Sequence, residues 1–287
     1  MERRLLNPKI DFVFKKIFGS EKHPGVLISF LNAVLKPKNN ITDVEIKNTD
    51  IDKSYIEDKF SRLDVKAVTS KNEIINIEIQ LKNEYNMIQR SLYYWSKLYE
   101  EQLEEGDRYD KLCRTVCINI LDFKYLKNDR FHNGYRLKEI ETNEELTDLE
   151  EIHFIEIPKL KKINSEKDIV DVLEGWVEFL RDPESEVVRK LEMTNKEIRE
   201  AKDELYRLSM DDKERALYFI SEKSIRDEIS ALANAEEKGM ERGIKKGERN
   251  KAIEIAKSLL DVLDIETISI KTGLSIKEIE DIAVMKK

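Results

Sequence analysis

The spacing of apolar positions changes along the first half of the chain, and each change predicts a new element. Residues 10–18 have apolar positions three and four apart and are followed by Gly19, which predicts a short amphipathic helix. Residues 26–35 predict a second helix that ends before Pro37. The spacing then becomes two, which is typical of strands. Predicted strands cover residues 44–51, 60–69, 73–81, 114–123, 135–140 and 152–157, with one helix at residues 85–105. This order predicts a mixed sheet flanked by helices, in an α/β or α+β fold.

The second half of the chain has a different pattern. Strand signals almost vanish after Pro158, and charged helices are predicted over residues 168–260, with a break at residues 181–183 that contain a proline. We therefore expect two parts, a sheet-containing domain at residues 1–160 and a charged helical region at residues 161–287.

Two features of the helical region bear on its role. Glycines recur every four residues in residues 239–247, on one helix face, where each costs up to about 1 kcal/mol. This stretch is either a soft hinge, which we favour, or a face approached by the backbone of a partner.

Residues 253–282 predict helix, turn and helix, with Ser275 as N-cap and Glu278 completing a capping box. The second helix is too acidic to favour DNA phosphates, so we prefer protein packing to a DNA-binding helix-turn-helix.

Composition limits the classes of function. Charged residues make up 38% of the chain, and 51 Lys and Arg face 59 Asp and Glu, so no overall basic field attracts nucleic acid or anionic lipid. The chain has only Cys113 and Cys117 and three histidines, too few for a disulfide framework or a Cys/His zinc cage. We expect the two cysteines to be buried small apolar residues, and the protein to be cytoplasmic. The longest apolar run, residues 24–35, is too short to cross a membrane.

The candidate chemistry lies in a predicted hairpin. Its strands, residues 61–69 and 73–81, flank a turn centred on Lys71, so residues equally far from Lys71 should pair. Asp64 then lies opposite Glu78. Because side chains alternate along a strand, both carboxylates share the polar face of the hairpin, while the intervening residues form an apolar face.

Two readings of this opposed pair remain open. Like charges at paired positions are destabilising, and a divalent cation such as Mg²⁺ would compensate them through carboxylate ligands. Gln80 lies on the same face and could orient a water or contact a phosphate. Alternatively, Asp64 and Glu78 belong to an ordinary solvated face, neutralised by Arg62 and Lys66 through salt bridges of about 0–1 kcal/mol.

Several short motifs occur in the order Asp11-Phe-Val-Phe-Lys15-Lys-Ile-Phe-Gly19, Arg62-Leu-Asp64-Val, Ile77-Glu78-Ile-Gln80, Tyr93-Tyr94 and Tyr99-Glu-Glu-Gln102-Leu-Glu-Glu-Gly106-Asp-Arg-Tyr109. Taken together and in this order, they resemble the Rpn family of recombination-promoting nucleases and transposases. This family belongs to the PD-(D/E)XK nuclease superfamily, and the resemblance runs to about residue 157. The resemblance implies a restriction-endonuclease-like core.

The resemblance also implies roles for four residues. Asp64 and Glu78 match the metal-binding acids, and Asp11 matches an acid on the first helix. Gln80 stands where the superfamily consensus has Lys. A lysine ammonium can stabilise developing negative charge on a phosphate, whereas a glutamine amide can only orient and hydrogen-bond. Without the resemblance, Asp11 would be read as a salt-bridge partner of Lys15 one helical turn away.

The resemblance therefore implies a metal-dependent DNA endonuclease that uses Mg²⁺ or Mn²⁺ in recombination or transposon-related DNA processing. The alternative is a catalytically degenerate nuclease fold that binds DNA or protein through its C-terminal helices. These helices could also join copies of the chain into a homo-oligomer. On the predicted helix at residues 85–105, Arg90 and Lys97 could contact phosphates, while core packing explains Tyr94 and Trp95 more simply. The histidines have no partners that would suggest a catalytic triad.

Overall fold

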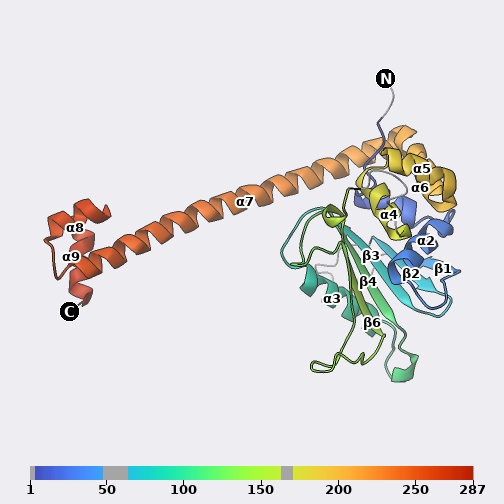
Figure 1. Cartoon of the computed structure of the whole chain (residues 1–287), viewed down its shortest axis with the longest axis horizontal. Helices are drawn as coiled ribbons and strands as arrows, with labels where there is room; N and C mark the ends of the chain where they lie inside the picture. The colour runs from blue at the N-terminus through green and yellow to red at the C-terminus, as the bar shows by residue number, and fades with distance from the viewer. Residues whose placement is uncertain (1–3, 48–63, 163–170, 287) are drawn as a thin grey trace. The chain divides into compact units, whose positions relative to one another are not determined.

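The computed structural model describes residues 4–47, 64–162 and 171–286, and in these residues the strands form one six-stranded sheet (Figure 1). The strands are β1 (Val44–Lys47), β2 (Val65–Thr69), β3 (Ile74–Gln80), β4 (Thr115–Leu121), β5 (His132–Tyr135) and β6 (Glu150–Glu156). Their order across the sheet is β1-β2-β3-β4-β6-β5. The β1, β2 and β3 strands pair antiparallel, β3, β4 and β6 pair parallel, and β5 closes the far edge antiparallel to β6. The expected mixed α/β sheet is confirmed.

Helices precede, interrupt and follow the sheet along the chain. They are α1 (Asp11–Phe18), α2 (Pro24–Leu35), α3 (Met87–Glu100), α4 (Val172–Arg181), α5 (Glu186–Thr194), α6 (Lys196–Met210), α7 (Asp212–Leu259), α8 (Ile265–Thr272) and α9 (Ile276–Lys286), with short 3₁₀ turns η1 (Tyr109–Lys111) and η2 (Ile157–Lys159). Among the described residues, we find no helix whose length and hydropathy would let it span a bilayer.

The two faces of the sheet are covered by different helices. Helix α3 packs on one face, where Met87, Tyr94 and Leu98 form an apolar cluster with Cys117 of β4 and Phe154 of β6. Cys117 is buried, as expected from the sequence, and Cys113 is partly buried. The α3 helix therefore covers the face that carries the even-numbered residues of β3.

The opposite face carries the aromatic part of the core. Phe18 of α1 contacts Phe30 of α2 and Trp176 of α4, with ring centroids 5.4 Å apart in both pairs. These three rings are fully buried, and burying each one stabilises the fold by about 1.5–3 kcal/mol. Helix α4 lies beyond residue 160, so the core of the sheet-containing part recruits residues from the predicted helical region.

The chain divides into two compact units, residues 1–223 and 224–287. In the first unit, Ser209 at the end of α6 accepts a hydrogen bond from the backbone N–H of Leu6 at 3.0 Å. The expected division into residues 1–160 and 161–287 concerns functional domains and stays a prediction.

The second unit has its own small core. Ala256 of α7, Ile268 of α8 and Ile279 of α9 are fully buried against one another. Ser275 Oγ accepts the N–H of Glu278 at 3.4 Å, and the Glu278 carboxylate accepts the N–H of Ser275 at 2.9 Å, which confirms the predicted capping box. The glycine repeat at residues 239–247 is helical, as predicted.

One predicted strand is misplaced. We expected residues 135–140 to form a strand, whereas β5 ends at Tyr135 and residues 136–140 contribute only an isolated bridge from Lys138 to Glu145. Within β5, a Cβ at Gly134 would lie 3.0 Å from the imidazole of His153 on β6, so the close packing of the two strands favours glycine at this position. The predicted strand segments at residues 48–51 and 60–63 lie outside the described residues.

Candidate active site

The β2–β3 hairpin has the predicted register. Val65 pairs with Ile77 and Ala67 with Ile75, so paired residues are equally far from Lys71. The turn closes through a 2.9 Å hydrogen bond from Asn72 N to Thr69 O, and Asn72 adopts the left-handed φ of 60° that asparagine tolerates well.

This register places Asp64 opposite Glu78, at the end of the hairpin away from the turn. Asp64 Oδ2 accepts a hydrogen bond from the backbone N–H of Ile79 at 2.7 Å, which fixes the carboxylate against β3. Glu78 is only 6% exposed. The sequence-based reading of an ordinary solvated face is therefore wrong at Glu78, because α3 covers this face.

Burial leaves the two carboxylates poorly stabilised as anions. Desolvation, together with the charges of Glu78 and Asp11, raises the pKa of Asp64 to about 7, although the Ile79 hydrogen bond and Arg90 act in the opposite direction. Desolvation also raises the pKa of Glu78, although Arg90 and a hydrogen bond from Asn76 act in the opposite direction. The end of the hairpin is therefore a site of concentrated negative charge.

Asp11 lies at the start of α1 and belongs to the same electrostatic group. Its Oδ1 accepts the backbone N–H of Phe12 at 2.6 Å, and its charge contributes to the raised pKa of Asp64. The structure thus brings three of the acids implied by the family resemblance near one another, and Gln80 ends the same strand as Glu78.

The cation beside this group is Arg90 of α3. Its Nη2 lies 3.4 Å from Glu78 Oε2, and its Nη1 lies 3.4 Å from Gln80 Oε1. We expected Lys66 to neutralise the pair, which is wrong, because Lys66 forms an ion pair with Glu101 at 3.3 Å instead. The other expected cation, Arg62, lies outside the described residues.

The donor set suits a hard divalent cation. Asp64 and Glu78 offer carboxylate oxygens, the ligands that Mg²⁺ prefers, and burial raises the pKa of both. Within the described ranges no cluster of three or more His, Cys, Asp or Glu side chains is arranged to hold a metal.

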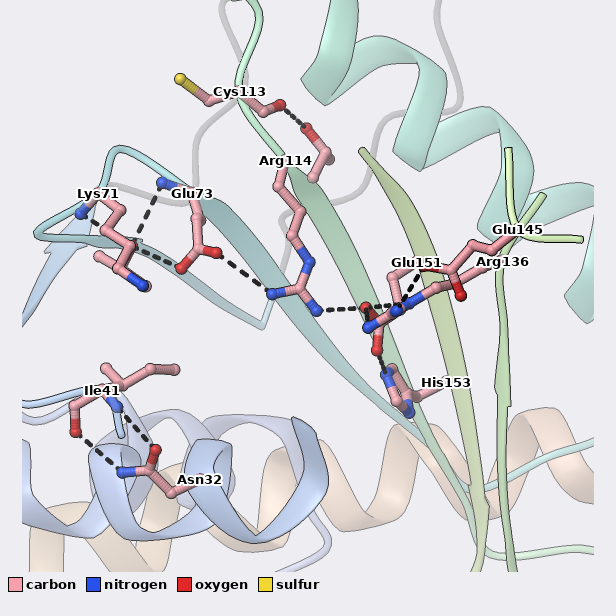
Figure 2. A network of polar contacts seen from close by, with 12 residues as sticks. Asn32, Ile41, Lys71, Glu73, Cys113, Arg114, Arg136, Glu145, Glu151 and His153 are labelled. Carbon is pink, nitrogen blue, oxygen red and sulfur yellow. Dashed lines mark hydrogen bonds and ion pairs between the residues drawn. The ribbon is translucent and has the colours of Figure 1, made fainter. Parts of the chain in front are cut away.

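A second polar network lies at the other end of β3 and β4 (Figure 2). Arg114 joins Glu73, 3.2 Å away, to Glu151 of β6, which also contacts Arg136 at 2.9 Å. His153 contacts Glu151 Oε1 at 2.6 Å.

The histidines complete this network. His132 Nε2 lies 2.9 Å from His153 Nδ1, so the two histidines, for which the sequence suggested no partners, contact each other, and His153 also contacts Glu151. No hydroxyl or thiol in the described part of the chain is hydrogen-bonded to either imidazole, and the network ties β5 to β6. Burial alone would raise the pKa of Glu151, but hydrogen bonds from His153 and Arg114 lower it to about 2.

Comparison with known proteins shows the family of the chain. A family model for PD-(D/E)XK nuclease family transposases matches residues 8–235. The chain belongs to this family. No curated protein and no solved structure matches the chain.

The match to the nuclease family transposases includes Asp11, Asp64, Glu78 and Gln80, and it extends through helices α4 to α6. Membership supports a role in nuclease or transposase chemistry. Arg90 also lies in the matched range, and the sequence had singled it out only as a phosphate contact. The spacing of ten residues between Gln80 and Arg90 does not predict their contact. The rotation of α3 relative to the sheet decides which side chain of the helix reaches Glu78 and Gln80.

Proposed function

We propose that the chain is a divalent-metal-dependent DNA endonuclease that hydrolyses phosphodiester bonds in recombination or transposon-related DNA processing. The observation that carries this proposal is the opposition of Asp64 and Glu78, two carboxylates with raised pKa values and no full counter-charge. Family membership supports the same chemistry. Mg²⁺ or Mn²⁺ held by Asp64 and Glu78 would supply an activated water and a positive charge at the phosphate.

The remaining side chains act around this pair. The hydrogen bond from Ile79 holds one oxygen of Asp64 and leaves its other oxygen for a ligand. Gln80 orients the attacking water or the phosphate through its amide, and Asp11 adds negative charge that favours cation binding. The substrate is DNA, and because the chain has a net charge of −8, its attraction for DNA must come from local positive charge.

The test is cleavage of supercoiled plasmid by the purified full chain in Mg²⁺, Mn²⁺ or Ca²⁺. We expect nicked or linear product in Mg²⁺ or Mn²⁺, no product in EDTA, and a loss of at least about 10²-fold in Asp64→Ala. Asp129→Ala, which removes an exposed acid that lies outside the site, serves as the matched control and should cleave normally. Equal activity in wild type and Asp64→Ala would contradict the proposal.

Gln80 supports one alternative. Since it replaces the lysine of the superfamily consensus, the site could be degenerate and the chain a DNA- or protein-binding module that acts through its C-terminal helices. This alternative predicts DNA or protein binding without product in any metal. Homo-oligomerisation through the same helices would appear in sedimentation as a mass loss when the full chain is compared with residues 1–223, the first compact unit.

The compartment is a separate part of the proposal. We place the protein in the cytoplasm, and the two free cysteines, Cys113 and Cys117, support a reducing environment.

A further inference from the structure

Phosphodiester cleavage needs positive charge that the side chain of Gln80 cannot supply. Negative charge grows on the phosphate oxygens in the transition state, and a fixed cation there is worth far more than a neutral dipole. If the proposed function holds, another residue of the chain must provide this charge beside the metal.

Arg90 is in position to do so. Lys66 is held by Glu101 at 3.3 Å, and Lys9 is held by Asp122 at 2.7 Å. Within the described part of the chain, Arg90 is the cation placed on both Glu78 and Gln80. It reaches them from α3, with its guanidinium carbon 5.4 Å from the centre of the Tyr94 ring. The ring supports the cation from one side and limits where the guanidinium can move.

The contacts of Arg90 are loose enough to be exchanged for a ligand. Both contacts to the acidic and amide side chains are 3.4 Å long, against about 2.7–2.9 Å for a strong bond between a cation and a carboxylate. Its Nε is buried and has no hydrogen-bond partner among the described residues. An arginine in this state keeps donors for a phosphate, which guanidinium binds in a two-pronged geometry.

Arg90 also sets the direction of the Gln80 amide. Arginine has donors and no acceptor, so the oxygen of Gln80 turns toward Arg90 Nη1 and its NH₂ group turns away. Gln80 is thereby left as a donor, the same hydrogen-bonding polarity that a lysine would have at this position.

We propose that Arg90 is a catalytic residue that binds the scissile phosphate and provides the positive charge missing at Gln80. When a cation takes over the charge of Glu78, Arg90 exchanges its long contact with that carboxylate for one with a phosphate oxygen. This inference rests on the proposed nuclease function, but the contact with phosphate can be measured without cleavage.

The experiment compares full-length wild type, Arg90→Met, Arg90→Lys and Arg108→Met. Arg108 is an exposed guanidinium that forms an ion pair with Asp110, so its loss is a matched control for charge alone. Cleavage kinetics are measured with plasmid in Mn²⁺, Mn²⁺ affinity by calorimetry, and affinity for a short DNA duplex in Ca²⁺ at several salt concentrations. Thermal melting confirms that each variant is folded.

We expect Arg90→Met to lower kcat by about 10²-fold. It should bind Mn²⁺ at least as tightly as wild type, because a competing cation has left Glu78. The logarithm of its DNA affinity should fall less steeply with the logarithm of the salt concentration, by about one unit of slope, as expected for the loss of one phosphate contact. Arg90→Lys should recover part of kcat, and Arg108→Met should behave as wild type in cleavage and metal binding.

Two results would overturn the proposal. A purely structural Arg90 would leave both kcat per folded molecule and the salt slope of Arg90→Met unchanged. Weaker Mn²⁺ binding in Arg90→Met with unchanged kcat at saturating metal would assign Arg90 to the arrangement of Glu78 instead. If wild type itself cleaves nothing, the nuclease proposal fails, while a lost unit of slope in Ca²⁺ would still show that Arg90 contacts phosphate.

Discussion

Burial and hydrogen bonding act in opposite directions on Asp64. The N–H of Ile79 stabilises its charged form, yet desolvation and neighbouring acids raise its pKa to about 7. A carboxylate in this state is a poor structural anion and a good ligand, since cation binding removes the cost of its charge.

This balance predicts a pH-dependent stability of the metal-free protein. A folded-state pKa of about 7 against the ordinary aspartate pKa of 3.8 means that the contribution of Asp64 to stability is fully present below about 3.8 and is lost as the pH rises through 7. Asp64→Asn should therefore raise the melting temperature at pH 8 more than at pH 5. Differential scanning calorimetry in EDTA measures this, with Asp129→Asn as the exposed control.

Metal binding should restore the stability that the metal-free wild-type protein loses as the pH rises. Mn²⁺ or Mg²⁺ at a hundredfold excess over Kd should add about 2.7 kcal/mol of stability, and Asp64→Asn should lose this response. A protein that neither metal stabilises, and that Asp64→Asn destabilises, would make Asp64 a structural anion.

The histidine network predicts how the stability of the fold decreases at acid pH. Burial and the nearby His153 lower the pKa of His132 to about 4, from the ordinary histidine pKa of 6.5. His132 is therefore neutral in the folded state, and stability that is full above pH 6.5 falls as the pH drops toward 4. His132→Gln should flatten this part of the profile in urea unfolding measured at pH 7, 5.5 and 4.5. An equally steep loss in the variant would assign the acid sensitivity to other groups.

Residue pairing within a hairpin could be predicted, and contacts between elements could not. The opposition of Asp64 and Glu78 follows from a short turn and strand alternation, which are local properties. Arg90 and the bond between His132 and His153 depend on how α3 and β5 pack on the sheet. No spacing in the sequence records that packing.

At the scale of elements, long periodic segments were predicted well. The helices α1 and α2 and the strands β3, β4 and β6 lie within a few residues of the predicted ranges. The β5 strand was misplaced because the apolar residues near 137 and 140 suggested a strand, whereas the ladder between β5 and β6 covers residues 132–135. Edge strands are set by tertiary contacts more than by their own pattern.

The glycine repeat of α7 is the element whose stability the sequence predicts most directly. A Cβ at Gly239, Gly243 or Gly247 would meet no atom within 4 Å, so alanine fits at all three positions. Each substitution should stabilise the local helix by up to about 1 kcal/mol. We expect fast amide exchange across residues 239–247 in wild type, slower exchange in residues 252–260, and slower exchange throughout in the triple alanine variant.

The triple alanine variant also distinguishes the two interpretations of the glycine repeat, a soft hinge or a face in contact with a partner. If a partner backbone lies against the glycines, their amides should be strongly protected in wild type, and added methyl groups should weaken self-association in sedimentation. A soft hinge predicts no change in mass.

At the scale of the whole molecule, the sequence predicted the fold class but not how the core is assembled. The apolar spacing of α4 to α6 indicated helices and gave no sign that Trp176 would enter the same cluster as Phe18 and Phe30. Amphipathic helices show which face is buried, while the surface that covers this face is chosen by the complete fold.

The packing of α6 and α4 on the first two helices has a consequence for synthesis of the protein. The apolar faces of α1 and α2 emerge from the ribosome first, but Trp176 and Ser209 follow only much later in the chain. At 5–20 residues per second, the delay between residues near 18 and those near 209 is about 10–40 s. During that time the nascent chain exposes Phe18 and Phe30 to water, which makes it a natural client for chaperones that bind apolar segments.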